Sequence, residues 1–186
     1  MKTEYRGTKL CYEETGEGRP IILLHGFLEN SSMWDYIPQS VFSTNRIIRI
    51  DLLGHGQSGC IGYVHSMEDM AMAVLFIAEE LNLDKFKIIG HSMGGYVALA
   101  IARIKPKSVV GICLLNSTFL TDDRQRKHVR KRAIEMAKSN YEALVRMSFV
   151  NLFAENSRRQ FSTEISRALK EALKTSVQGY IAAQEG

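Results

Sequence analysis

The chain has 186 residues and carries 24 Lys and Arg against 20 Asp and Glu, a formal net charge of +4. This length suits one domain with a sizeable core, and an apolar fraction of 45% is ordinary for a globular protein. No apolar stretch is long enough to cross a membrane, and none follows Met1–Arg6 as a signal peptide would require. The three cysteines are widely spaced, which favours a reducing compartment and offers no zinc site. We therefore expect a soluble, cytoplasmic protein.

The first half of the chain alternates apolar runs with helical patterns. Residues 5–14 are predicted to form an antiparallel pair or an edge strand, and Ile21–Leu24 is a continuous apolar run typical of a strand buried on both faces. Ser31–Phe42 is expected as a short helix interrupted by Pro38, and Arg46–Ile50 as the next strand.

The same alternation continues after the strand at Arg46–Ile50. Ser66 and Asp69 resemble a capping pair at the start of a helix. The apolar run Lys87–Ile89 predicts a strand, Tyr96–Ala102 a buried helix, and Val109–Leu115 a further buried strand. Together these elements predict a mostly parallel, doubly wound α/β sheet of about six strands with helices on both faces.

The character of the chain changes near Thr121, after the sixth predicted strand. Four segments are predicted to be helical: 124–138, 141–154, 157–173 and 175–184. We therefore expect an α/β core over residues 1–118 and a helical, cap-like segment over residues 119–186.

The positive charge gathers at the start of this helical segment, in Arg124, Arg126, Lys127, Arg130, Lys131 and Arg132. A basic run can bind nucleic acid or an anionic membrane. No aromatic residues interleave with these bases, as single-strand binding would favour. We interpret the run as a solvated helix face and expect neither a nucleic-acid nor a membrane partner.

Residues 90–94 read Gly-His-Ser-Met-Gly between a predicted strand and a predicted helix. A serine flanked by glycines on such a tight turn is a nucleophile elbow. Side chains at Gly90 and Gly94 would collide with the neighbouring strand and helix, and Ser92 would take a strained backbone conformation. The alternative is that Ser92 is simply the N-cap of the following helix.

Two further motifs follow predicted strands in the same way. His25-Gly26-Phe27-Leu28 follows the run Ile21–Leu24, and Asp51–Ser58 follows Arg46–Ile50. With the serine turn, these motifs resemble an α/β-hydrolase of the small esterase type over essentially the whole chain. In an open α/β sheet, ligands bind at the carboxyl ends of the strands, where all three motifs fall.

The resemblance implies that Ser92 is the nucleophile and that the backbone N–H groups of Phe27 and Met93 form the oxyanion hole. Met93 also begins a helix, whose dipole favours an anion there. The resemblance implies supporting places for Gly90, Gly94, Gly26, His25 and His91. It implies no cofactor, and no acid or cysteine cluster joins the two histidines at metal-ligand spacing.

Two other assignments in the Asp51 motif are disfavoured. Residues 54–59 formally match the dinucleotide fingerprint Gly-x-Gly-x-x-Gly, but the next helix is expected only at Ser66 instead of within the motif. Asp51 precedes Ser92, whereas the acid follows the serine in this family. We therefore expect a structural role for Asp51 in its loop.

The general base is the part of the pattern that does not fit. His128 is the only histidine after Ser92, and it lies in the basic helical segment. Asp122 follows the sixth strand and is a possible acid. We expect the chain to be the front part of a longer hydrolase, truncated within the cap region and inactive by itself.

The sequence therefore predicts a serine hydrolase acting on a small carboxylic ester or related acyl compound. The alternatives are a non-catalytic binding protein on a hydrolase scaffold and a cofactor-free haloperoxidase-like or C–C bond hydrolase relative. Val109–Leu115 would form an apolar, uncharged edge strand, so association through this edge is also expected.

Overall fold

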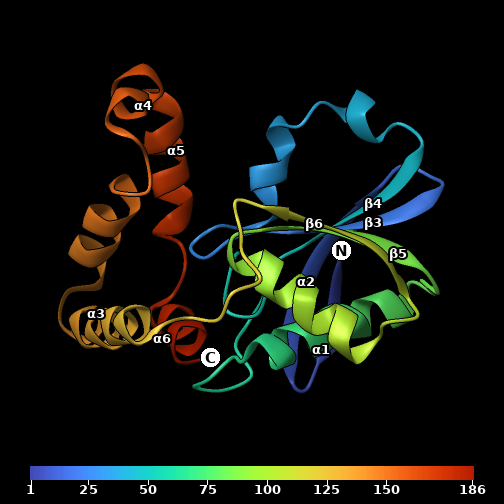
Figure 1. Cartoon of the computed structure of the whole chain (residues 1–186), viewed down its shortest axis with the longest axis horizontal. Helices are drawn as coiled ribbons and strands as arrows, with labels where there is room; N and C mark the ends of the chain where they lie inside the picture. Colours follow the sequence, from blue (N-terminus) through green and yellow to red (C-terminus); the bar gives the residue numbers. More distant parts are fainter.

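The protein is built on one six-stranded sheet (Figure 1). The computed structural model describes residues 1–186, apart from the side chains of Gln39 and Val41. The strands are β1 (Lys2–Tyr5), β2 (Thr8–Thr15), β3 (Arg19–Leu24), β4 (Asn45–Ile50), β5 (Phe86–His91) and β6 (Val109–Leu115). Their order is β1-β2-β4-β3-β5-β6. The pairs that β3 makes with β4 and β5, and that β5 makes with β6, are parallel, whereas those of β2 are antiparallel. The predicted α/β class is confirmed.

Helices α1 (Met67–Glu80) and α2 (Met93–Ile104) pack on one face of the sheet, where the largest apolar cluster lies. The cluster takes alternate residues of the strands, as the two-residue side-chain period of a strand requires: Ile22, Leu24, Ile48, Ile50 and Ile88. The predicted cap of α1 is confirmed. The Ser66 hydroxyl accepts the Asp69 N–H at 3.0 Å, and the Asp69 carboxylate accepts the Ser66 N–H at 3.2 Å.

The opposite face is covered by two short 3₁₀ helices, η1 (Ser31–Tyr36) and η2 (Gln39–Phe42). Trp34 of η1 packs there against a smaller apolar cluster that includes Ile21 and Ile47. The predicted short helix over 31–42, interrupted by Pro38, is found as two 3₁₀ helices, one on each side of Pro38. Ile37, before Pro38, is extended with ψ 122°, because proline disfavours helical backbone in the residue that precedes it.

Four helices follow the sheet: α3 (Arg124–Val150), α4 (Glu155–Gln160), α5 (Ser162–Ala172) and α6 (Val177–Glu185). Figure 1 shows them as a group beside the sheet. Asn140 kinks α3 with φ −152° and ψ 78°, between two segments that were predicted separately. The predicted helix over 157–173 is instead broken at Phe161, and the segment predicted to reach Ala154 ends at Val150.

The helical group has its own apolar cluster, which also receives Leu28 from the loop after β3. Helix α6 joins the group to the core. The His65 N–H donates to the Ala182 carbonyl oxygen at 2.9 Å, and the backbones of Gly54 and Gly179 approach too closely for a side chain on either residue. None of the helices described is long and apolar enough to cross a membrane.

Candidate functional site

Ser92 joins β5 to α2 in a strained conformation, with φ 48° and ψ −114°. Such a conformation costs about 1–3 kcal/mol in a residue other than glycine and persists only where neighbours hold it. Here the Ser92 N–H donates to the Leu115 carbonyl oxygen at 3.0 Å. The Ser92 carbonyl oxygen accepts from the Gly95 N–H at 3.0 Å and from the Ser117 hydroxyl at 2.7 Å. The last residue of β6, Ser117 just beyond it and the first turn of α2 therefore fix the elbow together.

The glycines around Ser92 are required by close backbone approaches. A Cβ atom at Gly90 would collide with the Gly94 carbonyl group. One at Gly94 would collide with the carbonyl oxygens of Leu24 and His25 at the end of β3. The first turn of α2 consequently lies directly against the loop that follows β3.

That loop opens with a turn over Gly26–Glu29, in which the Glu29 N–H donates to the Gly26 carbonyl oxygen at 3.2 Å. Leu28 has a positive φ of 61° and is only 4% exposed. The Phe27 ring packs on the rings of His55 and Tyr180, with centroids 5.8 and 5.0 Å away. Within the part of the chain that the structure describes, the N–H groups of Phe27 and Met93 donate no hydrogen bond.

His25 connects the loops that follow β3 and β4. Its imidazole is fully buried, with Nδ1 2.8 Å from the Gly26 carbonyl oxygen and Nε2 2.9 Å from the Leu52 N–H. Because Nε2 accepts that N–H, Nδ1 is the protonated nitrogen of a neutral ring. Burial also lowers the pKa of His25 below its ordinary value. The ring therefore acts as a fixed link between the loops.

The Asp51 carboxylate ties its own loop, which follows β4, to the start of η1. One oxygen accepts the Ser31 N–H at 2.8 Å and the other accepts the Gln57 N–H at 2.9 Å. Its backbone carbonyl oxygen accepts from the Ser58 hydroxyl at 2.7 Å. Helix α1 begins only at Met67, so no helix opens within residues 54–59 as a dinucleotide site would need.

Glu29 is a residue of this region that the sequence reasoning missed. Its Oε2 lies 2.6 Å from the Gly26 nitrogen and 2.7 Å from His91 Nδ1. The nearest sequence signal is its position three residues after Gly26, where a turn brings a side chain back to the first amide. The partner His91 is 62 residues away, and no local pattern indicates it.

Neither Asp122 nor His128 is joined to Ser92 by any hydrogen bond among the residues that the structure describes. The Asp122 carboxylate instead pairs with Arg130, whose Nε lies 2.6 Å from Oδ2. His128 is exposed on α3. For the described side chains, no group of three or more His, Cys, Asp or Glu is placed to hold a metal ion.

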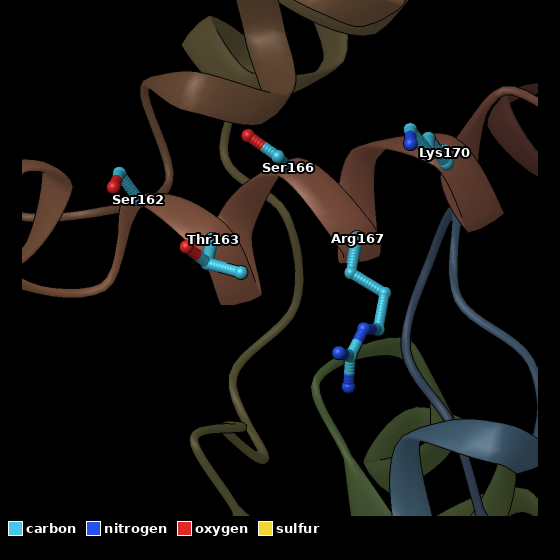
Figure 2. A pocket seen from close by; sticks show the side chains of 5 residues that line it. All are labelled: Ser162, Thr163, Ser166, Arg167 and Lys170. Atoms are coloured by element: carbon cyan, nitrogen blue, oxygen red, sulfur yellow. The ribbon is translucent and has the colours of Figure 1, made fainter.

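A hollow of about 410 Å³ lies along α5 and contains none of the predicted site residues. Figure 2 shows its lining, Ser162, Thr163, Ser166, Arg167 and Lys170. Arg167 extends away from α5, and its Nη1 donates to the Tyr36 hydroxyl oxygen at 2.7 Å. The hollow is open and belongs to one helix, so its side chains converge on no common point.

Known proteins resemble this chain in sequence and in fold. Residues 19–173 match the family described as alpha/beta hydrolase fold. Among solved structures, the chain is similar to a malate-bound thermophilic esterase from Thermogutta terrifontis. The TM-score is 0.90 and the sequence identity 30%, and the match covers 100% of this chain and 69% of the esterase.

Two curated proteins are also similar. The chain is 30% identical over 123 residues to (E)-2-((N-methylformamido)methylene)succinate hydrolase from Acinetobacter baylyi, which covers 66% of this chain and 46% of that protein. It is 37% identical over 101 residues to a non-heme haloperoxidase from Rhodococcus erythropolis, which covers 52% of this chain and 36% of that protein. The chain spans 33% to 46% of the length of five curated relatives.

Proposed function

This chain belongs to the alpha/beta hydrolase fold family, and we propose that it is a serine hydrolase acting on a small carboxylic ester or a related acyl compound. The observation that carries the proposal is the strained backbone of Ser92, φ 48°, at the turn from β5 into α2. A strained serine at such a turn presents its hydroxyl above the sheet. A serine that served only as an N-cap would have an extended backbone and a capping side chain, and Ser92 has neither.

The proposed reaction has two halves. Ser92 Oγ bonds to the acyl carbon while a general base takes its proton, and the carbonyl oxygen becomes an oxyanion. The carbonyl then re-forms as the bond to the leaving alcohol breaks, and the alcohol takes the proton from the base. Water repeats these steps on the acyl-serine, which releases the carboxylic acid and restores the Ser92 hydroxyl.

The oxyanion is proposed to be held by the N–H groups of Phe27 and Met93. Both lie beside Ser92 in the fold, Phe27 in the loop against which α2 packs and Met93 at the start of α2. The positive end of the α2 dipole adds to this preference for an anion. Loss of one such donor lowers kcat by about 10²–10³-fold in other serine hydrolases.

The general base is the component of the proposed reaction for which this chain offers the least support. The fold places the acid and the histidine after the serine in chain order, and here His128 is exposed while Asp122 pairs with Arg130. We therefore propose that Ser92 in this chain alone reacts slowly, at the residual rate that oxyanion stabilisation provides without a base.

We also propose that the protein is cytoplasmic. Its three cysteines are free, as in proteins of a reducing compartment.

The similarity to a non-heme haloperoxidase favours one second candidate, a cofactor-free haloperoxidase-like reaction at the same serine. The chain is 37% identical to that relative over 101 residues, against 30% to the succinate hydrolase over 123 residues. The two candidates share the elbow and differ in the compound that turns over.

Covalent labelling tests the serine assignment. The chain is incubated with an alkyl fluorophosphonate, and peptide mass mapping locates the adduct. We expect a slow adduct on Ser92 in the wild type, formed at the residual rate proposed above, and none in Ser92→Ala, while the exposed-site control Ser139→Ala is labelled as slowly as the wild type. Labelling that persists at another serine in Ser92→Ala would overturn the proposal. Two residual activities then separate the candidates. Hydrolysis of p-nitrophenyl esters supports the ester hydrolase, and halogenation of monochlorodimedone supports the haloperoxidase-like reaction.

A further inference from the structure

One carboxylate oxygen joins the loop after β3 to the end of β5. Glu29 Oε2 accepts the Gly26 N–H at 2.6 Å and lies 2.7 Å from His91 Nδ1. Gly26 follows β3, and His91 is the last residue of β5, directly before Ser92. The Glu29 and His91 side chains are about three quarters buried, at 25% and 24% exposed. Solvent therefore screens this pair less than a pair on the open surface.

The space around Gly26 is filled by the same groups. A Cβ atom placed on Gly26 would lie 2.6 Å from Glu29 Oε2, 2.8 Å from His91 Nδ1 and 3.1 Å from Ser92 Cβ. The Cα atom of Gly26 is thus enclosed by the Glu29 carboxylate, the His91 imidazole and the Ser92 side chain. Any side chain at position 26 would push the carboxylate and imidazole away from the elbow.

Both backbone groups of Gly26 are held. Its N–H donates to the Glu29 carboxylate, and its carbonyl oxygen accepts from the Glu29 N–H at 3.2 Å and lies 2.8 Å from His25 Nδ1. That carbonyl belongs to the same planar peptide unit as the Phe27 N–H. The peptide is trans, so fixing the direction of the carbonyl fixes the N–H in the opposite direction.

We propose that Glu29, braced by His91, is a positioning residue that orients the Phe27 N–H toward the oxyanion formed at Ser92. The inference rests on the serine hydrolase proposed above. Glu29 touches no reacting atom. Its carboxylate holds the Gly26 N–H and so fixes the turn in which the backbone N–H of Glu29 holds the Gly26 carbonyl oxygen, and that carbonyl lies in the Gly26–Phe27 peptide. The strain of Leu28, φ 61°, lies within the same turn, which is typical of a loop held for function and not for stability alone.

Nuclear magnetic resonance of the 15N-labelled 186-residue chain tests the link without requiring turnover. We expect the Gly26 amide proton to resonate far downfield and to exchange slowly with solvent. In Glu29→Ala, exchange at Gly26 should rise by about tenfold or more, the size expected for a lost hydrogen bond to a charged group. Glu29→Gln keeps an acceptor oxygen and should retain most of the protection. Glu17→Ala, at an exposed turn, is the matched control.

A second variant keeps the test valid if Glu29→Ala does not fold. His91→Leu removes the imidazole donor and leaves the Gly26–Glu29 turn intact, so its exchange should lie between those of the wild type and Glu29→Ala. If Gly26 exchanges as in the wild type in both variants, the inference is overturned.

Titration with phenylboronic acid, which forms a tetrahedral anion on a serine hydroxyl, separates the two proposals. We expect shifts of the Phe27 and Met93 amides and an affinity about tenfold weaker in Glu29→Ala, with Glu29→Gln closer to the wild type. Equal affinity in wild type and Glu29→Ala, with binding abolished in Ser92→Ala, would overturn the positioning role and leave the hydrolase proposal standing. Binding that persists in Ser92→Ala would overturn the hydrolase proposal, and the exchange data would still decide whether Glu29 holds Gly26.

Discussion

The Ser117 hydroxyl donates to the Ser92 carbonyl oxygen at 2.7 Å, so a residue just after β6 holds the strained turn between β5 and α2. The Ser92 N–H donates to the Leu115 carbonyl oxygen on the same strand at 3.0 Å. The end of β6 and the residues that directly follow it therefore support the Ser92 backbone on both sides. The elbow depends on a strand that contributes no side chain to the proposed reaction.

Removing the Ser117 hydroxyl should destabilise the fold. Ser117→Ala leaves the half-buried carbonyl group of a strained residue with one donor fewer, and we expect a loss of about 1–2 kcal/mol in the free energy of unfolding. Urea titration followed by circular dichroism measures it. Ser139→Ala is the control, because the Ser139 hydroxyl lies 3.3 Å from the Glu135 carbonyl oxygen on an exposed helix face. Equal midpoints for the two variants would contradict the prediction.

Gly94 should tolerate no side chain. In Gly94→Ala the new methyl group meets the carbonyl oxygens of Leu24 and His25, which are backbone atoms and cannot move aside singly. We expect the free energy of unfolding to fall by at least about 2 kcal/mol, which is toward the upper end of the losses found when a packed site receives extra atoms. Gly62→Ala is the matched control, because nothing lies within 4 Å of its new atom and its φ is not positive. It should stay within about 1 kcal/mol of the wild type by urea titration. A Gly94→Ala protein as stable as Gly62→Ala would contradict the close approach of α2 to β3.

The core and the elbow could be predicted from the sequence because their signals are local. The run Ile21–Leu24 is apolar throughout, and the structure buries it in the centre of the sheet. The Gly90–Gly94 spacing around Ser92 indicates both the turn and the close approaches that require glycine. The Ser66 and Asp69 pair is likewise visible in four consecutive residues.

The features that sequence reasoning missed depend on contacts between distant residues or on weak local preferences. Glu29 meets His91 only because the ends of β3 and β5 are neighbours in the sheet. Pro38 was recognised as an interruption, but the choice of 3₁₀ over α geometry on either side was not. The break at Phe161 has no Gly or Pro to mark it.

Acidification should weaken the fold through its buried histidines. Burial, with neighbouring His25 adding to it, lowers the pKa of His55 from 6.5 to about 3. Between these two pKa values the unfolded chain binds a proton that the folded chain does not. The contribution of the neutral His55 ring to the free energy of unfolding is therefore fully present above pH 6.5. It is lost as the pH falls toward 3, by about 1.4 kcal/mol per pH unit.

His55→Asn removes this titration and should flatten the loss of unfolding free energy measured by urea titration between pH 7 and pH 5. The asparagine amide can replace the contact of Nδ1 with the Leu53 carbonyl oxygen, which lies 3.1 Å away in the wild type. His128→Asn, on an exposed face of α3, serves as the control and should keep the slope of the wild type. An unchanged slope in His55→Asn would show that other groups cause the acid sensitivity.

The chain should associate with a second copy of itself through β6. This strand lies at the end of the sheet, where its only neighbour among the described strands is β5. Val110, Ile112 and Leu115 are exposed on it, at 55%, 38% and 39%. Strand β6 has no charged residue, so it lacks the devices that usually keep an edge strand from pairing with another chain. Sedimentation velocity at rising concentration should therefore show a growing dimeric or larger species.

A charge on the edge tests whether β6 is the contact. Ile112→Lys places an ammonium group in the middle of the strand and should return the chain to a monomer, because pairing would bury that charge without a partner. Val129→Lys, which adds the same charge at an exposed position of α3, should associate like the wild type. A wild-type chain that stays monomeric and unfolds cooperatively at every concentration would contradict the prediction, as would equal association of the two lysine variants.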